Sequence, residues 1–350
     1  LDVVMDIPAG TAPQRPLEAG QAARIMTGAP LPDGADAVVP VEQTDSQWIP
    51  GSAAAPSPAV LIRQTVSPGA SVRPAGEDVR AGQIVLEAGR ALRPQDIGML
   101  ASLGHERVAV TPRPRVAIVS TGDELLEVSE PLRPGKIRDS NSYTVAGMVT
   151  QCGGEALRLP IARDTLESVR GVFRQALAAE THVIISSAGV SVGAADVVRT
   201  VLDELGEIGF WRVNVRPGKP LAFGHLGGVP FFGLPGNPVS AMVTFDIFVR
   251  PFLLRLQNRD TAAATVIAMT GEDIQSDGRR SYLRVRLAHE GGQLVARTTG
   301  TQSSGALLSM VLADGLLIVP EDVTFVPAGS PLEVRLFGSG NTFGLVRDFS

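Results

Sequence analysis

The stretch Val116-Ala117-Ile118-Val119-Ser120-Thr121-Gly122-Asp123-Glu124 decides the fold of this chain. It opens on an apolar run without polar alternation, which is typical of a strand buried on both faces of a sheet. Similar runs follow at 183–187 and 231–234, and 157–161 is also strand-like. Helical patterns separate or follow these runs, at 142–151, 165–179, 196–205 and from residue 238. Strands that alternate with helices of this length build βαβ units, so the sequence predicts an α/β domain with a mainly parallel sheet.

Segments with β patterns flank this domain on both sides. Short strand patterns occur at 23–26 and 37–41, and another at 83–86 precedes a helix that begins at Pro94 and ends at Gly104. After the α/β domain, His289-Glu290-Gly291-Gly292 is a hairpin signal, and the last segment is predicted to be a small β-barrel or sandwich. The predicted division is into residues 1–71, 72–113, 114–258 and 259–350.

Composition excludes several classes of protein. The chain has 350 residues, of which 44% are hydrophobic and 19% charged, with a net charge of −5. These values describe a soluble globular protein and argue against nucleic acid as the main partner. No apolar run approaches the roughly 20 residues that span a bilayer, so no membrane segment is expected. The single cysteine, Cys152, excludes an internal disulfide and a cysteine-cluster metal site.

Two loops of the α/β domain carry acidic or small residues directly after predicted strands. Ligands of open α/β sheets bind at the carboxyl ends of the strands. The adjacent carboxylates of Asp123 and Glu124 suit a hard cation such as Mg²⁺, although acidic residues are also favoured at a helix N-terminus. The loop 186–196 is rich in serine, glycine and alanine, which let backbone N–H groups approach a phosphate. A tight turn with Asp196 as N-cap is the alternative interpretation.

Two further loops combine rigidity with polar groups. Arg216-Pro217-Gly218-Lys219-Pro220 presents two cations on a stiff turn, which suits phosphate, although it is also compatible with an ordinary solvated turn. Lys136 and Lys219 are the only lysines among 31 basic residues, a weak hint that a compact ammonium is needed at both positions. Leu234-Pro235-Gly236-Asn237-Pro238 begins a helix and offers its free N–H groups to an anion.

Asp164 has two interpretations of equal weight. The pattern Asp164-Thr165-Leu166-Glu167 resembles a capping box, in which Asp164 would have a structural role. Its place after a predicted strand would equally put it at the ligand-binding edge. An oxyanion loop, several carboxylates and a rigid basic turn together indicate phosphoryl or nucleotidyl chemistry with Mg²⁺, without identifying the substrate.

The same motifs, together and in this order, resemble the family of bacterial MoeA and the E domain of gephyrin. They are 120–124, 186–196, 216–220 and 234–238, joined by Arg24-Ile25-Met26-Thr27-Gly28-Ala29-Pro30 and Gly76-Glu77-Asp78. The resemblance implies a cytoplasmic molybdopterin molybdenumtransferase, which inserts molybdenum from molybdate into adenylylated molybdopterin and releases AMP with Mg²⁺. It also implies a three-layer molybdopterin-binding domain, a lever-like domain at 72–113, and a β-barrel after the central domain.

The resemblance also implies an assembly and a set of site residues. The family forms an elongated homodimer, with the active site between the central domain of one subunit and the Thr27 region of the other, and transient contact with molybdopterin adenylyltransferase is expected. Glu124, Asp164 and Asp196 match acidic positions that contact Mg²⁺ or molybdate, and Lys219 and Thr27 complete the expected catalytic set. The expected substrate-binding residues are Asp123, Ser187, Gly189, Ser191, Gly193, Arg216, Pro235, Gly236, Asn237, Pro238, Arg73, Asp78 and Ser304.

The sequence departs from the family pattern at three places. Arg216 stands where lysine is common, and Ala188 stands where a second glycine is usual. The N-terminal Ser-x-Met-Asp-Gly-Tyr-Ala stretch of the family does not occur, so we expect Leu1 to lie partway through an incomplete first β module. The alternatives are a gephyrin-like scaffold, or a relative that shares the central domain, such as the molybdopterin adenylyltransferase or a damage-inducible amidohydrolase. Those relatives lack the flanking modules.

Overall fold

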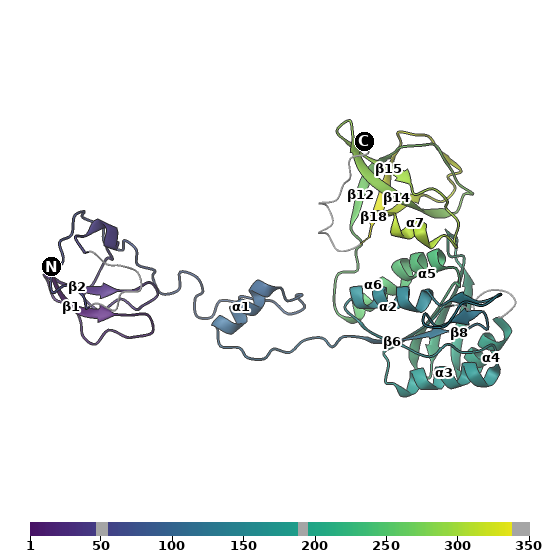
Figure 1. Ribbon diagram of the computed structural model, residues 1–350, viewed down its shortest axis with the longest axis horizontal. Coiled ribbons are helices and arrows are strands. Elements are labelled where there is room, and N and C mark those ends of the chain that lie inside the picture. The colour runs from purple at the N-terminus through teal and green to yellow at the C-terminus, as the bar shows by residue number, and fades with distance from the viewer. Residues whose placement is uncertain (47–54, 188–194, 338–350) are drawn as a thin grey trace. The chain divides into compact units, whose positions relative to one another are not determined.

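The computed structural model describes residues 1–46, 55–187 and 195–337, and the chain separates into two compact units, 1–88 and 89–350 (Figure 1). The first unit contains a parallel pair of strands, β1 (Asp2–Ile7) and β2 (Gln21–Ile25). Arg24 on β2 forms an ion pair with Asp6 on β1, with 2.5 Å between Nη2 and Oδ2. This bond holds the pKa of the Asp6 carboxyl below its usual value.

Two strands predicted for the first unit are wrong. Residues 37–40 make no strand ladder, and the short helix η1 (Val41–Gln43) follows Pro40. Residues 83–86 contain no strand, because the Gln83 N–H closes a turn onto the Arg80 carbonyl after Gly82, whose φ is +82°. In the first stretch the Val38 N–H donates to the Ala70 carbonyl outside any strand, and Pro40 has no N–H to give to a ladder. In the second stretch Ile84 stays 79% exposed, so no apolar face is buried against a sheet. The predicted four-part division of the chain stays a prediction.

The second unit begins with the helix α1 (Pro94–Ser102) and continues into the central six-stranded sheet. The strand order is β6-β3-β7-β11-β10-β8. Their bounds are β6 (Glu155–Arg158), β3 (Arg115–Ser120), β7 (Val183–Ser187), β11 (Val229–Leu234), β10 (Pro220–Leu226) and β8 (Gly206–Arg212). The first four run parallel and β10 runs against both its neighbours, so the predicted mainly parallel sheet is confirmed. β6 lies two to three residues before its predicted position.

Helices cover both faces of this sheet, which gives the predicted three layers (Figure 1). α2 (Asn141–Gln151), α5 (Pro238–Thr244), η2 (Phe245–Val249) and α6 (Arg250–Leu256) pack against the face that carries Val116 and Ile118. α3 (Leu166–Ala178) and α4 (Ala195–Leu205) pack against the opposite face, which carries Ala117 and Val119. The alternation along β3 therefore fills two cores, which explains why its sequence is apolar without interruption.

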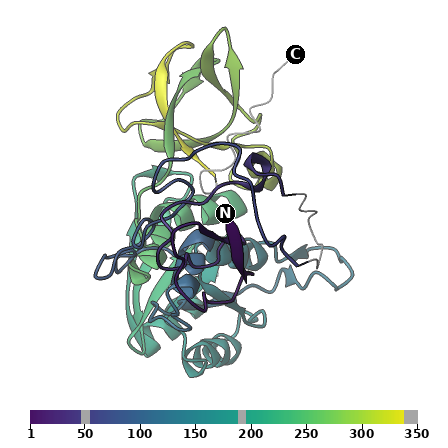
Figure 2. The ribbon, with the colours of Figure 1, turned by 90° about the vertical axis from the view of Figure 1, so that its left-hand side faces the viewer.

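The last segment is a closed β-barrel, as predicted (Figures 1 and 2). Its ring runs β15-β12-β18-β16-β14 and closes through the β14–β15 pairing. The bounds are β12 (Thr265–Thr270), β14 (Arg280–Glu290), β15 (Gln293–Thr298), β16 (Gly315–Val319) and β18 (Pro331–Leu336). The predicted hairpin joins β14 to β15, and Gly291 and Gly292 both have positive φ, as a two-residue type I′ turn requires.

Short elements complete the second unit. β4 (Leu125–Leu126) pairs with β5 (Ile137–Arg138), and β13 (Ile274–Gln275) pairs with β17 (Phe325–Val326). β9 (Val215–Arg216) adds to β14, and α7 (Leu307–Val311) packs with Val239 and Val243 of α5 through Met310. The central sheet and the barrel are therefore joined by a shared core and a strand pairing. In the described part of the chain no helix has the length and apolar character needed to cross a membrane.

Candidate active site

The sheet topology gathers the predicted loops at one edge. β3, β6, β7, β8 and β11 all end at the same edge, because each has the same direction relative to the antiparallel β10. Lys219 immediately precedes β10 and therefore lies at that edge as well. Asp123, Asp164, Asn237 and Lys219 thus come from loops along one line of strand ends, as expected for an open α/β sheet.

The two acidic loops are bound to each other by reciprocal hydrogen bonds. The Asp123 N–H donates to Asp164 Oδ2 at 3.2 Å, and the Asp164 N–H donates to Asp123 Oδ1 at 3.3 Å. Glu124 folds back over Gly122, where a Cβ atom would lie 2.5 Å from the carboxylate oxygen Oε2. These contacts place three carboxylates on neighbouring loops and give the Asp123–Asp164 pair a defined geometry.

Asp164 is not the cap of the helix that follows it. Thr165 is the N-cap of α3, and its hydroxyl accepts the N–H of Ser168 at 3.3 Å. The capping interpretation of Asp164 is therefore wrong, because the neighbouring hydroxyl takes that role. The Asp164 carboxylate binds across to the loop after β3 instead, which is the ligand-edge position.

Replacing Thr165 with alanine should lower the free energy of unfolding by about 1 kcal/mol, the usual effect of losing a hydroxyl cap. Chemical denaturation of the full chain measures this change. An unchanged stability would show that Thr165 does not cap α3.

The donor set of the acidic loops fits Mg²⁺. Each of Asp123 and Asp164 uses one carboxylate oxygen in the reciprocal pair, which leaves a second oxygen on each. Among the described residues no three carboxylate, histidine or cysteine side chains form a ready-made metal cage. Magnesium commonly takes one or two carboxylates and completes its shell with water and substrate phosphates, so the pair is sufficient.

Part of the predicted anion loop falls outside the described residues. Gly189, Ser191 and Gly193 lie there, and so does the side chain of Asp196, whose backbone is in the first turn of α4. Ser187 is described: it is buried, and its hydroxyl lies 3.1 Å from the Ser120 hydroxyl on the neighbouring strand. The two adjacent strands therefore end in a buried pair of hydroxyl groups.

The basic turn is rigid and its two cations differ in their surroundings. Gly218 has φ of +111°, and a Cβ atom there would lie 2.4 Å from Cγ2 of the buried Thr244, so only glycine fits. Arg216 forms an ion pair with Asp277 of the barrel segment at 3.4 Å. A bond from Arg279, with a smaller contribution from Arg216, holds the pKa of the Asp277 carboxyl below its usual value. Within the described residues Lys219 has no side-chain partner.

Asn237 connects the fourth loop to the barrel segment. Asn237 is the N-cap residue of α5, but its side chain makes no capping bond and donates from Nδ2 to the Ser304 hydroxyl at 2.9 Å. The Ser304 carbonyl accepts the N–H of Val239 at 3.1 Å. Asn141 donates to the Gly236 carbonyl at 2.7 Å. The predicted residues Pro235, Gly236, Asn237, Pro238 and Ser304 therefore form one connected group.

Arg284 is a functional candidate that the sequence patterns do not reveal. It lies on β14 and is only 1% exposed, with bonds to the Ser309 hydroxyl and the carbonyls of Thr301 and Ser303. No carboxylate partners it among the described residues, and burial lowers the pKa of its guanidinium to about 10. An unpaired buried cation is unfavourable, so its position directly beneath the Ser304 loop indicates a role there.

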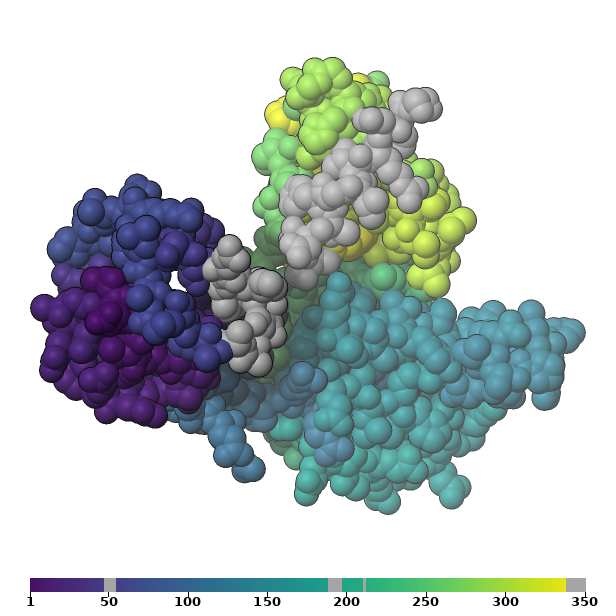
Figure 3. All heavy atoms as spheres, turned by 60° about the vertical axis from the view of Figure 1, so that its left-hand side comes forward, coloured from purple at the N-terminus to yellow at the C-terminus, as the bar shows by residue number. Residues whose placement is uncertain are grey.

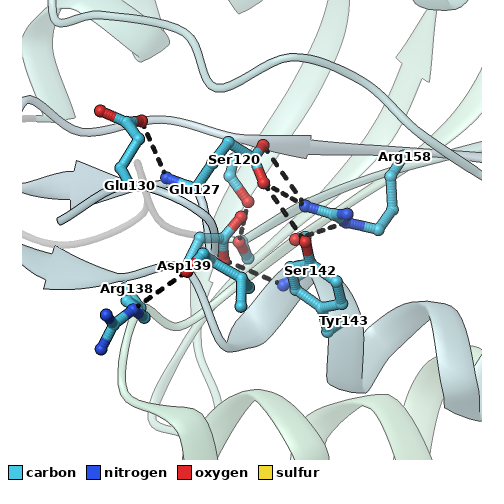
Figure 4. A network of polar contacts seen from close by, with 10 residues as sticks. Ser120, Glu127, Glu130, Arg138, Asp139, Ser142, Tyr143 and Arg158 are labelled. Atoms are coloured by element: carbon cyan, nitrogen blue, oxygen red, sulfur yellow. Dashed lines mark hydrogen bonds and ion pairs between the residues drawn. The ribbon is translucent and has the colours of Figure 1, made fainter.

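A polar network fixes the neighbouring end of β6 (Figure 4). Arg158 donates to the Ser142 hydroxyl at 2.9 Å and pairs with Glu127 at 3.2 Å, while its guanidinium lies 3.5 Å above the Tyr143 ring. Asp139 accepts the N–H of Ser142 and is 2% exposed. This network ties the β4–β5 segment to the start of α2.

The remaining predicted residues belong to the first unit. Thr27, Arg73 and Asp78 lie within residues 1–88, and all three are exposed. Thr27 occupies a turn closed by the Ala29 N–H onto the Met26 carbonyl at 3.0 Å. Their participation in the site at the sheet edge stays a prediction.

Comparison with known families assigns a description to most of the chain. Residues 2–104 match the MoeA N-terminal region (domain I and II), and residues 117–255 match a probable molybdopterin binding domain. Residues 268–337 match the MoeA C-terminal region (domain IV).

Individual relatives are similar over nearly the whole chain. Molybdopterin molybdenumtransferase 2 of Mycobacterium tuberculosis is 39% identical, with 95% of this chain and 82% of the relative covered. The molybdopterin molybdenumtransferase of Haemophilus influenzae is 33% identical, with 94% and 80% covered. A solved molybdopterin biosynthesis MoeA protein from Pyrococcus horikoshii has 33% identity and a TM-score of 0.80, with 97% of this chain and 82% of that chain covered.

Proposed function

The chain belongs to the MoeA family of molybdopterin molybdenumtransferases, and from this premise we propose how the edge of its central sheet acts on the substrates. The protein is a transferase of molybdenum cofactor biosynthesis. We propose that it inserts molybdenum from molybdate into adenylylated molybdopterin, with release of AMP. The joining of the MoeA N-terminal and C-terminal regions to the central domain favours this activity over that of relatives built on the central domain alone.

The observation that carries the proposal is the distance along the edge between the acidic pair and the basic turn. The acidic pair Asp123 and Asp164 follows β3 and β6, whereas Lys219 precedes β10. β7 and β11 lie between β3 and β10, so the two groups are three strand spacings apart, about 14 Å. This distance suits an elongated substrate in which a diphosphate joins a nucleoside to a second ring system.

The residues at the sheet edge would have separate roles toward such a substrate. Lys219 would bind phosphate oxygens and stabilise the negative charge that develops on the departing AMP. Asp123 and Asp164 would hold Mg²⁺, which supplies a positive charge that offsets repulsion between molybdate and the anionic substrate. The Asn237–Ser304 bond fixes the wall contributed by the barrel segment.

Molybdenum content of the product tests this proposal. The full chain is incubated with adenylylated molybdopterin, molybdate and Mg²⁺, and molybdenum bound to molybdopterin is quantified by mass spectrometry. We expect molybdenum insertion that stops when Mg²⁺ is removed by a chelator. The absence of molybdenum from the product would reject the activity.

We further propose that the reaction takes place in the cytoplasm and that the molybdopterin adenylyltransferase supplies the substrate.

A homodimer with shared active sites is part of the proposal. Thr27 of one subunit would complete the site that contains Asp164 of the other, as the family resemblance implies. Inactive Thr27→Val and Asp164→Asn subunits, mixed and allowed to exchange, should then recover about a quarter of wild-type AMP release, because half of the dimers gain one intact site. No recovery, despite exchange confirmed by native mass spectrometry, would place Thr27 and Asp164 in the same subunit's site or Thr27 outside the site.

A further inference from the structure

Lys136 is a cation at the acidic loop that the proposed mechanism does not use. It lies in the segment between β4 and β5, and its ammonium donates to the Asp123 carbonyl at 2.6 Å. In the described part of the chain this is the only hydrogen bond of its side chain, and no ion pair accompanies it. An ammonium has three N–H donors, so two remain for another acceptor.

The backbone holds Lys136 next to the carboxylates. The N–H of the following residue, Ile137, donates to the Glu124 carbonyl at 2.8 Å, and β5 pairs with β4 through Leu125 and Ile137. Arg163 adds a second cation, with Nη1 at 3.5 Å from the Asp123 carbonyl. The segment that carries Lys136 projects from the surface of the α/β domain (Figure 3).

A cation at this place opposes the binding of a metal ion. Its charge repels any divalent cation that Asp123, Glu124 and Asp164 attract, so it weakens metal affinity when no anion is present. The same charge attracts an anion that a metal brings to the loop. A lysine bound to a neutral carbonyl, rather than paired with a carboxylate, keeps its charge uncompensated for that purpose.

We propose that Lys136 binds the phosphate oxygens of the adenylylated substrate that lie nearest the acidic loop, while the Lys219 side chain reaches the same diphosphate from the other side. This inference rests on the proposed function and adds a second phosphate-binding cation to it. The alternative is a purely structural role, in which Lys136 only ties the β4–β5 segment to the loop after β3. The two roles predict different effects of removing the Lys136 ammonium. Loss of a phosphate ligand weakens anion binding and not metal binding, whereas loss of a structural tie weakens both.

The test measures the affinity of the full chain for two probes by calorimetry: ADP with excess Mg²⁺, and Mn²⁺ alone. The variants are Lys136→Met, Lys136→Arg and the control Arg133→Met, which removes an exposed cation from the same segment. For Lys136→Met we expect the dissociation constant of ADP to rise about five- to tenfold, the effect of losing one charge-assisted hydrogen bond at a partly exposed site. Its affinity for Mn²⁺ should stay the same or increase, whereas Lys136→Arg and Arg133→Met should bind ADP like the wild type.

The outcomes separate the inference from the function on which it rests. Normal binding of ADP by Lys136→Met would overturn the role of Lys136 and leave the proposed function untouched. A parallel loss of ADP and Mn²⁺ affinity would overturn it in favour of the structural role. A wild-type chain without affinity for ADP and Mg²⁺ would overturn both the inference and the phosphate-binding part of the proposed site.

Discussion

Replacing Asp164 with asparagine should lower the rate of Mg²⁺-dependent AMP release by about 10²-fold or more, the scale of losing one preorganised electrostatic contact. The asparagine side-chain oxygen can still accept the Asp123 N–H, which lies 3.2 Å from Asp164 Oδ2. Because the cap of α3 is Thr165, the free energy of unfolding should change little. The variant thus removes charge at constant shape, and Asp196→Asn should act in the same way if Asp196 shares the site.

The neighbouring Thr165→Ala variant is the matched control for Asp164→Asn. Its free energy of unfolding should fall by about 1 kcal/mol while its rate of AMP release stays unchanged. Asp164→Asn is therefore expected to be the less active of the two variants, and Thr165→Ala the less stable. Single-turnover AMP release and chemical denaturation on both variants make the comparison. Near-normal turnover in Asp164→Asn would remove Asp164 from the catalytic set.

Replacing Arg284 with methionine should lower AMP release at least tenfold and change the free energy of unfolding by no more than about 2 kcal/mol. The guanidinium holds the carbonyls of Thr301 and Ser303, and the loop they belong to presents Ser304 to Asn237. Loss of these bonds destabilises the fold, whereas removal of a buried charge stabilises it, so the two effects oppose each other. The rate of AMP release has no opposing gain, because the loop that carries Ser304 loses its fixed position.

The charge of Arg284 also predicts the pH dependence of stability. Burial lowers the pKa of its guanidinium to about 10, so the folded protein releases this proton more readily than the unfolded chain. The charge therefore destabilises the fold fully below pH 10, and this effect declines as the pH rises above 10 toward the ordinary arginine pKa of the unfolded chain. Consequently, the stability of the wild type relative to Arg284→Met should be constant between pH 6 and 9 and should increase above pH 10.

Two further variants show whether Arg284 acts through the Ser304 loop. Arg284→Lys keeps a cation and should recover part of the activity. Arg286→Met, two residues along the same strand, removes a bond to the Leu312 carbonyl outside that loop and should leave AMP release unchanged. Equal losses of activity in Arg284→Met and Arg286→Met would indicate a general effect on the barrel.

The sequence predicts the central domain well because burial on both faces leaves a strong signal. The apolar strands at 116–120 and 183–187 and the helices between the strands appear where the patterns place them. In the first unit the strand pattern at 23–26 appears as β2, whereas residues 37–41 and 83–86 are largely apolar but form no strand. The position of β6 is displaced because its residues are only partly buried, which weakens the apolar pattern.

The site could be predicted where its residues follow strands, and not where long-range contacts decide. Topology alone places Asp123, Asp164 and Lys219 at one edge. The ligand-edge role of Asp164 needs its hydrogen bonds with Asp123, which lies 41 residues away in the chain and which local sequence does not indicate. Arg284 lies in an ordinary alternating strand, and only the fold shows that it is buried with no carboxylate partner in the part of the chain that the structure describes.

The most direct test of the account is AMP released by the wild-type chain in a single turnover with adenylylated molybdopterin and Mg²⁺, measured with and without molybdate. The account predicts release of AMP in proportion to active sites when molybdate is present, and little release when it is absent, because nucleotide loss is coupled to molybdenum insertion. Release at the same rate without molybdate, or no release in its presence, would contradict the assignment of the sheet edge as a molybdenum-inserting site.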